Sequence, residues 1–235
     1  MNLILLNHDD FIAEDRVRLT GRRLAHIRTV HRAELNAELR VGLLNGKVGY
    51  GIITQIDTDF VELTTSIDQS PPEFLPVTLL LALPRPKMLK RVLQSVTSLG
   101  VKQIYLINSF RVEKSFWNSP ILEPEKLHEQ LLLGLEQARD TMLPEVHLRQ
   151  RFKPFVEDEL PELCQGTRAF VAHPTSEKSA VLVPNQPTTL AIGPEGGFIP
   201  YEIDKLEACG FVPFSLGERI LRVETAVPVL LSQLM

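Results

Sequence analysis

Two short apolar runs near the carboxyl end, each followed by an irregular loop, constrain the fold of this chain more than any other feature. The first run, Thr188–Ile192, passes into the glycine-rich stretch Gly193–Phe198, and the second, Phe211–Leu216, opens into the charged stretch Gly217–Ala226. A helix is expected between them over Pro200–Gly210. Neighbouring strand ends with irregular loops form the crevice in which open α/β sheets hold ligands. The pattern predicts such a crevice, although two ordinary strand-to-helix turns would give the same pattern.

The residues of the two loops indicate different contributions to a site. Glycine lets the backbone take positive φ and approach a ligand closely, with N–H groups free to point at it. In the second loop, Pro228 limits where the last helix begins, because proline is harmless only in the first turn of a helix. We therefore expect this helix to begin close to Thr225. Three charged side chains then lie on a loop at its N-terminus: Arg219, Arg222 and Glu224.

The first part of the chain, residues 1–72, reads as a small β domain. Asn45-Gly46 lies between two apolar stretches, Leu39–Leu44 and Lys47–Ile56, and predicts a type I′ hairpin. Further strands are expected over Leu3–Leu6, Val17–Thr20 and Phe60–Ile67, enough for a small barrel. The proline-containing segment Gln69–Glu73 is a plausible linker.

Residues 73–235 alternate strands and helices, which predicts a mainly parallel α/β sheet. Strands are expected over Val77–Leu83, Gln103–Asn108 and Ala169–Ala172, and helices over Lys87–Leu99 and Pro124–Thr141. The apolar face of the longer helix consists of Leu127, Leu131, Leu135, Ala138 and Met142, widened by Leu132 and Leu133. A face this wide often has cover on two sides, and a subunit interface is one way to supply it.

Charge is unevenly distributed in a chain of net charge −4. Six arginines and no acid occur between Arg16 and Arg32. A helix over Arg22–Ala33 would turn Leu24, Ile27 and Val30 inward and place Arg28 and Arg32 on one exposed face. That face is either a phosphate-binding stripe with salt-sensitive affinity or simply a solvated helix surface.

Composition restricts the class of protein further. The first eleven residues have no basic segment followed by a long apolar one, so no signal peptide is expected. The longest apolar stretch, Leu75–Pro84, is shorter than the ~20 residues that span a bilayer. Cys164 and Cys209 lack metal-ligand spacing and suit a reducing compartment as buried thiols without a disulfide. These features predict a cytoplasmic protein with no membrane and no metal.

At the carboxyl end, Ile192–Phe198 followed by Leu216–Ala226 resembles the paired signature of the RsmE methyltransferases, which belong to the SPOUT class. The resemblance implies an α/β fold with a C-terminal SPOUT α/β trefoil knot over residues 73–235, preceded by a PUA-like RNA-binding β-barrel over residues 1–72. It also implies a homodimer that transfers a methyl group from S-adenosylmethionine to N3 of a uridine in small-subunit (16S) ribosomal RNA, at position 1498 of the usual RNA numbering.

The same resemblance implies the residues of two binding surfaces. Three loops would hold the methyl donor, mostly through backbone groups, at Ala172, His173, Ile192, Gly193, Pro194, Gly196, Gly197, Leu216, Gly217, Ile220, Leu221 and Thr225. The RNA-binding arginines would be Arg16, Arg18, Arg22, Arg23, Arg28, Arg32 and Arg139.

Methylation of a uridine N3 determines which catalytic side chains are needed. The N3 proton must leave, and negative charge builds on O2 and O4 as it does, so the site needs a cation or a hydrogen-bond donor near those oxygens. Arg222 is the first choice for this cation and Arg219 the second. Glu224 either accepts the proton or orients Arg222 and caps the helix. Glu195, inside the glycine turn, is expected to be structural.

Departures from the family pattern lie outside the two signature loops. Pro84-Arg85 replaces a frequent Lys-Gly, Ser98–Val101 replaces Glu-Leu-Gly-Val, Glu136–Asp140 carries its arginine one place early, and His31-Arg32 replaces Leu-Arg without the following Pro-Gly-Asp turn. A paralogue with another RNA target, or a catalytically silent RNA-binding module, is therefore an alternative. A nucleotide phosphate cradle is disfavoured, because neither Gly-x-x-x-x-Gly-Lys-Ser/Thr nor Gly-x-Gly-x-x-Gly occurs.

Overall fold

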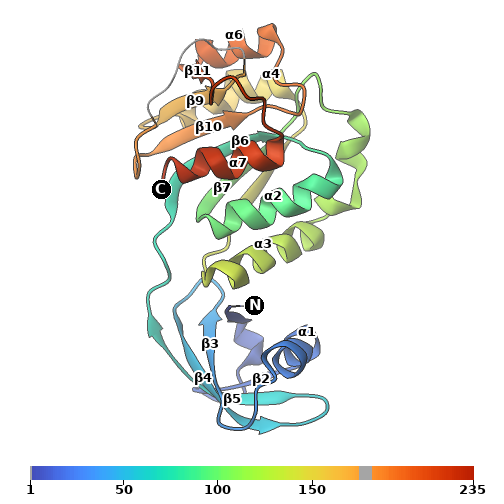
Figure 1. The fold of residues 1–235 in the computed structure, drawn as a ribbon, viewed down its shortest axis with the longest axis vertical. Coiled ribbons are helices and arrows are strands. Elements are labelled where there is room, and N and C mark those ends of the chain that lie inside the picture. Colours follow the sequence, from blue (N-terminus) through green and yellow to red (C-terminus); the bar gives the residue numbers. More distant parts are fainter. Residues whose placement is uncertain (1, 175–181) are drawn as a thin grey trace. The chain divides into compact units, whose positions relative to one another are not determined.

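The computed structural model describes residues 2–174 and 182–235, which form two compact units (Figure 1). The first unit comprises Met1–Glu73 together with Leu132–Leu143, and the second comprises Phe74–Leu131 and Pro144–Met235. The chain is therefore an α/β protein in which a short later segment packs with the N-terminal unit.

The first unit is built on a five-stranded mixed sheet of order β1-β3-β4-β5-β2. Its strands are β1 (Ile4–Leu6), β2 (Arg16–Leu19), β3 (Glu38–Leu43), β4 (Val48–Ile56) and β5 (Val61–Gln69). β1 pairs with β3 in parallel and the other pairs are antiparallel. Burial alternates along β2, where Val17 and Leu19 are buried and Arg16 and Arg18 are exposed, because successive side chains of a strand point to opposite faces.

The β3–β4 hairpin lies where it was predicted, but its turn is not type I′. A type I′ turn needs positive φ at both central residues, whereas only Asn45, at +58°, has it and Gly46 does not. Tertiary contacts within the unit account for the difference. The Asn45 N–H donates to the carbonyl of Thr141 at 2.8 Å, and the Asn45 side-chain oxygen accepts the N–H of Leu143 at 2.9 Å.

The basic helix of the first unit is shorter than expected. α1 (Gly21–His26) continues as a π-helix over Ile27–His31, and Arg32, at φ +47°, ends it in the left-handed region. Leu24 and Ile27 are buried as predicted, but Val30 is 63% exposed. A π turn takes in more residues than an α turn, which rotates later side chains away from the α-helical face. The prediction that Val30 faces inward and that Arg28 and Arg32 share one helical face is therefore wrong.

The second unit contains a six-stranded sheet, all of whose pairs are parallel, with the order β11-β9-β10-β6-β7-β8. Its strands are β6 (Leu75–Ala82), β7 (Val101–Ile107), β8 (Glu145–Arg149), β9 (Arg168–Ala172), β10 (Thr188–Ile192) and β11 (Val212–Phe214). The parallel sheet was predicted, whereas β8, a half-exposed edge strand, was not. Because every strand is parallel, all the loops that follow the strands leave from one edge of the sheet.

Helices connect and cover these strands. They are α2 (Pro86–Ser98), α3 (Pro124–Ala138), α4 (Phe152–Pro154), α5 (Leu160–Leu163), α6 (Pro200–Ala208) and α7 (Val223–Ser232), with a π-helix over Phe155–Glu159 and 3-10 turns over Lys114–Asn118 and Pro120–Leu122. A further 3-10 turn, His8–Asp10, belongs to the first unit. α7 packs beside α2 in front of the sheet (Figure 1). No helix in the described ranges is long and apolar enough to cross a membrane.

Two further expectations are corrected. The long helix ends at Ala138 and not at Thr141, because Arg139 takes a left-handed φ of +59°, and Met142 is consequently outside its apolar face and 39% exposed. Cys164 and Cys209 are free thiols as expected, but both are only partly buried.

Candidate active site

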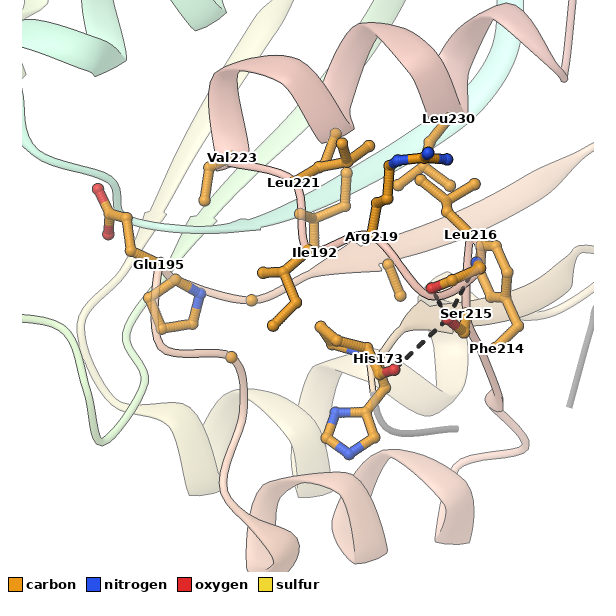
Figure 2. Close-up of a pocket in the computed structure, with 18 residues that line it drawn as sticks. His173, Ile192, Glu195, Phe214, Ser215, Leu216, Arg219, Leu221, Val223 and Leu230 are labelled. Atoms are coloured by element: carbon orange, nitrogen blue, oxygen red, sulfur yellow. Dashed lines mark hydrogen bonds between the residues drawn. The ribbon is translucent and has the colours of Figure 1, made fainter. Parts of the chain in front are cut away.

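A pocket opens at the carboxyl edge of the sheet, over the ends of β9, β10 and β11 (Figure 2). It encloses about 610 Å³, including the solvent at its mouth. Three loops and one face of α7 line it: Ala172, His173, Pro174, Ile192, Gly193, Pro194, Glu195, Gly197, Phe214, Ser215, Leu216, Gly217, Arg219, Ile220, Leu221, Val223, Ala226 and Leu230. The two loops that the sequence singled out therefore meet in one cavity.

The glycine-rich loop needs its glycines for steric reasons. A Cβ atom on Gly193 would lie 3.0 Å from the backbone nitrogen of Phe198, so a side chain there would push the loop open. Gly197 has a φ of +71°, which side chains rarely adopt, and its N–H closes a turn on the Pro194 carbonyl at 2.7 Å. The loop thus presents bare backbone to the cavity.

The loop after β11 is held to the loop after β9. The hydroxyl of Ser215 lies 3.4 Å from the carbonyl oxygen of Pro174 and 3.0 Å from that of Gly217, and it accepts the N–H of Gly217 at 3.1 Å. Gly217 itself has a φ of +112°. Beyond it, Leu216 and Ile220 line the pocket although they are 37% and 81% exposed, so this wall is apolar and open.

His173 enters the pocket lining at the end of β9. Its backbone N–H donates to the carbonyl of Phe214 at 2.8 Å, while its ring points away from Ile192 and Leu221 (Figure 2). Burial lowers the pKa of the imidazole, and Glu207 opposes this shift. The lowered pKa favours the neutral imidazole, and the backbone N–H of His173 is used to join the ends of β9 and β11.

The last helix begins at Val223, close to the expected start at Thr225, but the placement of Glu224 on the loop and of Pro228 in the first turn is corrected. Glu224 lies in the first turn of α7, and Pro228 lies inside the helix. Pro228 has no N–H to donate one turn back, but Val223, Val227 and Leu230 are buried on the same side, and this burial outweighs one lost hydrogen bond.

The two arginines of the second loop differ in position. Arg219 lines the pocket. Arg222 is the N-cap residue of α7, and its carbonyl accepts the N–H groups of Thr225 and Ala226 at 2.9 and 2.8 Å. Its guanidinium is 85% exposed and 4.0 Å from the Glu224 carboxylate. Only Arg219 of the three predicted catalytic residues is among the lining residues, while Arg222 and Glu224 lie beside them in sequence.

Most predicted donor-binding positions line the pocket; Gly196 and Thr225 do not. Gly196 lies on the outer side of its loop, where a Cβ atom would be 2.8 Å from Cδ of Arg111.

Five lining residues were not predicted from the sequence: Phe214, Ser215 and the α7 residues Val223, Ala226 and Leu230. The three helical residues recur at i, i+3 and i+7, a spacing that could have indicated a shared face.

The arginines proposed for RNA binding all belong to the first unit, and several are neutralised there. Arg18 pairs with Glu62 at 2.7 Å, Arg22 with Glu136 at 2.7 Å, and Arg23 with Asp10 at 2.5 Å. Arg28 donates to the carbonyl of Thr58 at 3.2 Å and so keeps its charge. Arg16, Arg32 and Arg139 are exposed. The positive charge of the basic segment is therefore partly balanced by acidic side chains from other parts of the same unit.

Among the described residues, no group of three or more His, Cys, Asp or Glu side chains could hold a metal ion. The pocket lining itself offers backbone and apolar contacts, with the guanidinium of Arg219 at its wall.

Comparison with known proteins identifies the class to which this fold and pocket belong. Residues 71–235 match the sequence model of the RNA methyltransferase domain family, so the protein is an RNA methyltransferase. Ribosomal RNA small subunit methyltransferase E of Treponema pallidum is 28% identical over 232 residues, covering 96% of this chain and 87% of that protein. The enzyme of the same name from Mesomycoplasma hyopneumoniae is 31% identical over 163 residues, covering 67% and 68%. The chain belongs to this small subunit methyltransferase E family, as its two signature loops predicted.

A solved structure has the same fold. Ribosomal RNA small subunit methyltransferase E from Neisseria gonorrhoeae, bound to S-adenosyl methionine, superimposes with a TM-score of 0.76 at 19% identity, covering 99% of this chain and 95% of that one.

Proposed function

We propose that this protein transfers a methyl group from S-adenosylmethionine to N3 of a uridine in 16S ribosomal RNA. The observation that carries the proposal is the meeting of the Gly193–Gly197 loop and the Leu216–Leu221 loop in a single pocket. Relatives named ribosomal RNA small subunit methyltransferase E support the substrate, and the neighbour bound to S-adenosyl methionine supports the donor. The binding partner is then ribosomal RNA. The protein would act in the cytoplasm, because ribosomal subunits are made there.

The pocket residues fit this donor. Gly193 has no Cβ atom to crowd the loop, and Gly197 takes a φ that other residues rarely adopt. A ligand can therefore lie against the main chain. Ile192, Leu221 and Leu230 supply apolar surface for the faces of an adenine ring. We expect backbone groups of the three loops to hold its polar edges, together with Gly196 and Thr225 at the margin. When bound, the donor supplies a sulfonium methyl group, which needs no metal.

We assign the cation of the reaction to Arg219, with Arg222 at the mouth. As the bond from sulfur to the methyl carbon breaks, the bond from that carbon to N3 forms and the N3 proton must leave. A guanidinium stabilises the negative charge that develops on O2 or O4. The position of Arg219 in the pocket lining supports this role, and the exposed side chain of Arg222 supports its approach from outside. Glu224, which is 27% exposed and near Arg222, orients that arginine or accepts the proton.

We further propose the finer features of the fold. A trefoil knot of the SPOUT class is supported by the path of the chain after β11. This strand lies at the edge of the sheet, whereas α7 lies beside α2, and the residues that connect them run along the pocket. A PUA-like role for the first unit is supported by its mixed five-stranded sheet and by the exposed Arg16, Arg28, Arg32 and Arg139. A homodimer is supported by the open apolar wall at Leu216 and Ile220.

Three measurements test the function. Calorimetry with S-adenosylmethionine tests the donor, and absence of binding contradicts the proposal. Transfer of a labelled methyl group to unmodified small subunits tests turnover, and donor binding without transfer favours the catalytically silent module. Mass-spectrometric mapping of the methylated nucleotide tests the target, and a position other than uridine N3 favours the paralogue.

A further inference from the structure

The loops after β6 and β7 leave the same edge of the sheet as the pocket loops but do not line the pocket. Three of their residues form what we call the rim strip: Arg85, Phe110 and Arg111. The side chain of Arg85 is 68% exposed and Phe110 is 77% exposed. Arg111 is exposed as well. An exposed phenylalanine beside an exposed arginine, with a second cation on the neighbouring loop, is unusual for a surface that faces only water.

A buried carboxylate fixes the loop that carries Phe110. Glu202 of α6 is 3% exposed. Its Oε1 accepts the backbone N–H of Phe110 at 2.7 Å, and its Oε2 accepts the hydroxyl of Ser109 at 3.1 Å and the N–H of Ile199 at 3.0 Å. Hydrogen bonds to an ionised acceptor are stronger than those between neutral groups. The backbone beneath Phe110 is therefore held in place, and the exposure of its ring is a property of a fixed loop.

The rim strip also touches the glycine-rich loop of the pocket. The guanidinium of Arg111 donates to the carbonyl of Gly196, and a Cβ atom on Gly196 would lie 2.8 Å from Cδ of Arg111, so a side chain at this position would force Arg111 to shift. Arg85 Nε lies 3.9 Å from a carboxylate oxygen of Glu195. Since Glu195 and Gly197 line the pocket, the strip borders its rim.

We propose that the rim strip binds a nucleotide of the RNA next to the one that is methylated, with Phe110 stacking on its base and the two arginines neutralising phosphates. This rests on the proposed function, since it assumes an RNA substrate at the pocket. Proteins recognise unpaired nucleotides by stacking bases on aromatic side chains in positively charged surroundings. Arg111 contacts a neutral carbonyl and keeps its charge, and Arg85 meets Glu195 only at long range. A second copy of this chain is less well matched to an exposed phenylalanine with one arginine beside it and another on the neighbouring loop.

The test compares two exposed phenylalanines at opposite edges of one sheet. Phe110 follows the carboxyl end of β7, whereas Phe74, 63% exposed, precedes the amino end of β6. We expect Phe110→Ala to weaken binding of an unmodified rRNA fragment on the order of tenfold, the usual loss for one stacked base. Phe110→Trp should restore it, and Phe74→Ala should leave it unchanged. Affinity for S-adenosylmethionine should be the same in all variants.

Arg85 provides a second readout, because phosphate contacts depend on salt. Arg85→Ala should lower the slope of log affinity against log salt by about one. Unchanged RNA affinity in Phe110→Ala overturns the proposal. Equal losses of donor and RNA affinity also overturn it, since the loop would then be merely structural. A fall in self-association, measured by sedimentation, would assign the strip to a second copy of the chain.

The outcomes separate this inference from the proposed function. Methyl transfer by the unaltered protein, with no effect of Phe110→Ala on RNA affinity or transfer, contradicts the rim strip alone. RNA affinity that depends on Phe110, without any methyl transfer, contradicts the proposed function alone.

Discussion

The backbone N–H of His173 donates to the carbonyl of Phe214 at 2.8 Å and joins the ends of β9 and β11. This contact continues the parallel pairing of the two strands one step beyond Ala172 and brings the loops that follow them together. The shape of the pocket therefore depends on sheet register as much as on the loops themselves.

Gly197 and Gly166 have nearly the same φ, +71° and +72°, but of the two only Gly197 lines the pocket. An alanine at either position should cost about 1–2 kcal/mol of unfolding free energy, because the left-handed region is strained. Only Gly197→Ala should weaken S-adenosylmethionine binding, on the order of tenfold. Urea unfolding and calorimetry on both variants test this, and equal donor affinities would contradict a role for Gly197.

Arg219 lies at the wall of the pocket and its neighbour Glu218 does not. Arg219→Ala should lower kcat by roughly 10²–10³, the usual loss for one donor to a developing oxyanion. Donor affinity should change little, and Glu218→Ala should be close to unaltered protein. Arg222→Ala should also lower transfer, and a larger effect there than at Arg219 would place Arg222 on the substrate oxygens. Single-turnover transfer assays measure the difference.

Stability should fall in mildly acid solution because of His173. Burial lowers the pKa of its imidazole below the ordinary 6.5, so the unfolded chain binds a proton that the folded chain resists. This contribution to the free energy of unfolding is therefore fully present above about pH 6.5. It decreases as the pH falls through the pKa of His173 in the folded protein. Urea unfolding at pH 7.5 and 5.5 should show this loss, and His173→Asn should reduce it. The exposed His128→Asn serves as control, and a pH dependence unchanged by His173→Asn would contradict the prediction.

Cys164 should be an unreactive thiol. Burial raises its pKa to about 11, with a hydrogen bond to Thr189 acting in the opposite direction. Because the thiolate is the nucleophile, alkylation by iodoacetamide at pH 8 should be far slower in the folded protein than in urea. Stability should also fall as pH rises from about 9 through 11, since the unfolded chain loses this proton first. Mass spectrometry of the alkylated peptide gives the rate.

Substitutions of Arg22 and Arg16 should distinguish an effect on stability from an effect on RNA affinity. Glu136 is 1% exposed and pairs with Arg22, whereas Arg16 is exposed on β2. Arg22→Ala leaves a buried carboxylate without its cation and should destabilise the protein by about 2–3 kcal/mol. Arg22→Ala with Glu136→Gln should recover part of this. Arg16→Ala should leave stability unchanged and weaken RNA binding, with a smaller salt dependence.

The features that could be predicted from the sequence are those that depend on neighbouring residues, such as strand boundaries and the alternation of strands and helices. The boundaries of β10 match the apolar run Thr188–Ile192, and the parallel sheet followed from alternating strands and helices. The convergence of the two signature loops could be predicted because parallel strands release their loops at one edge. The lining by α7 was missed, since Pro228 was expected to shorten the helix, and the burial of Val223 and Val227 overrode that expectation.

Long-range contacts account for most of the remaining differences. The partners of the basic segment, Glu62 and Glu136, lie far away in sequence, so a run of arginines could not be distinguished there from a phosphate-binding stripe. The π-helix that exposes Val30 also lacks a sequence signal. Glu202 is a similar case, because its three hydrogen-bond donors come from two different loops.

The contribution of Ala226 and Leu230 to the pocket ties the cavity to the state of α7. The cavity is incomplete whenever that helix is locally unfolded, so the methyl donor binds only molecules in which α7 is in place. Bound donor should therefore slow hydrogen exchange of the α7 amides.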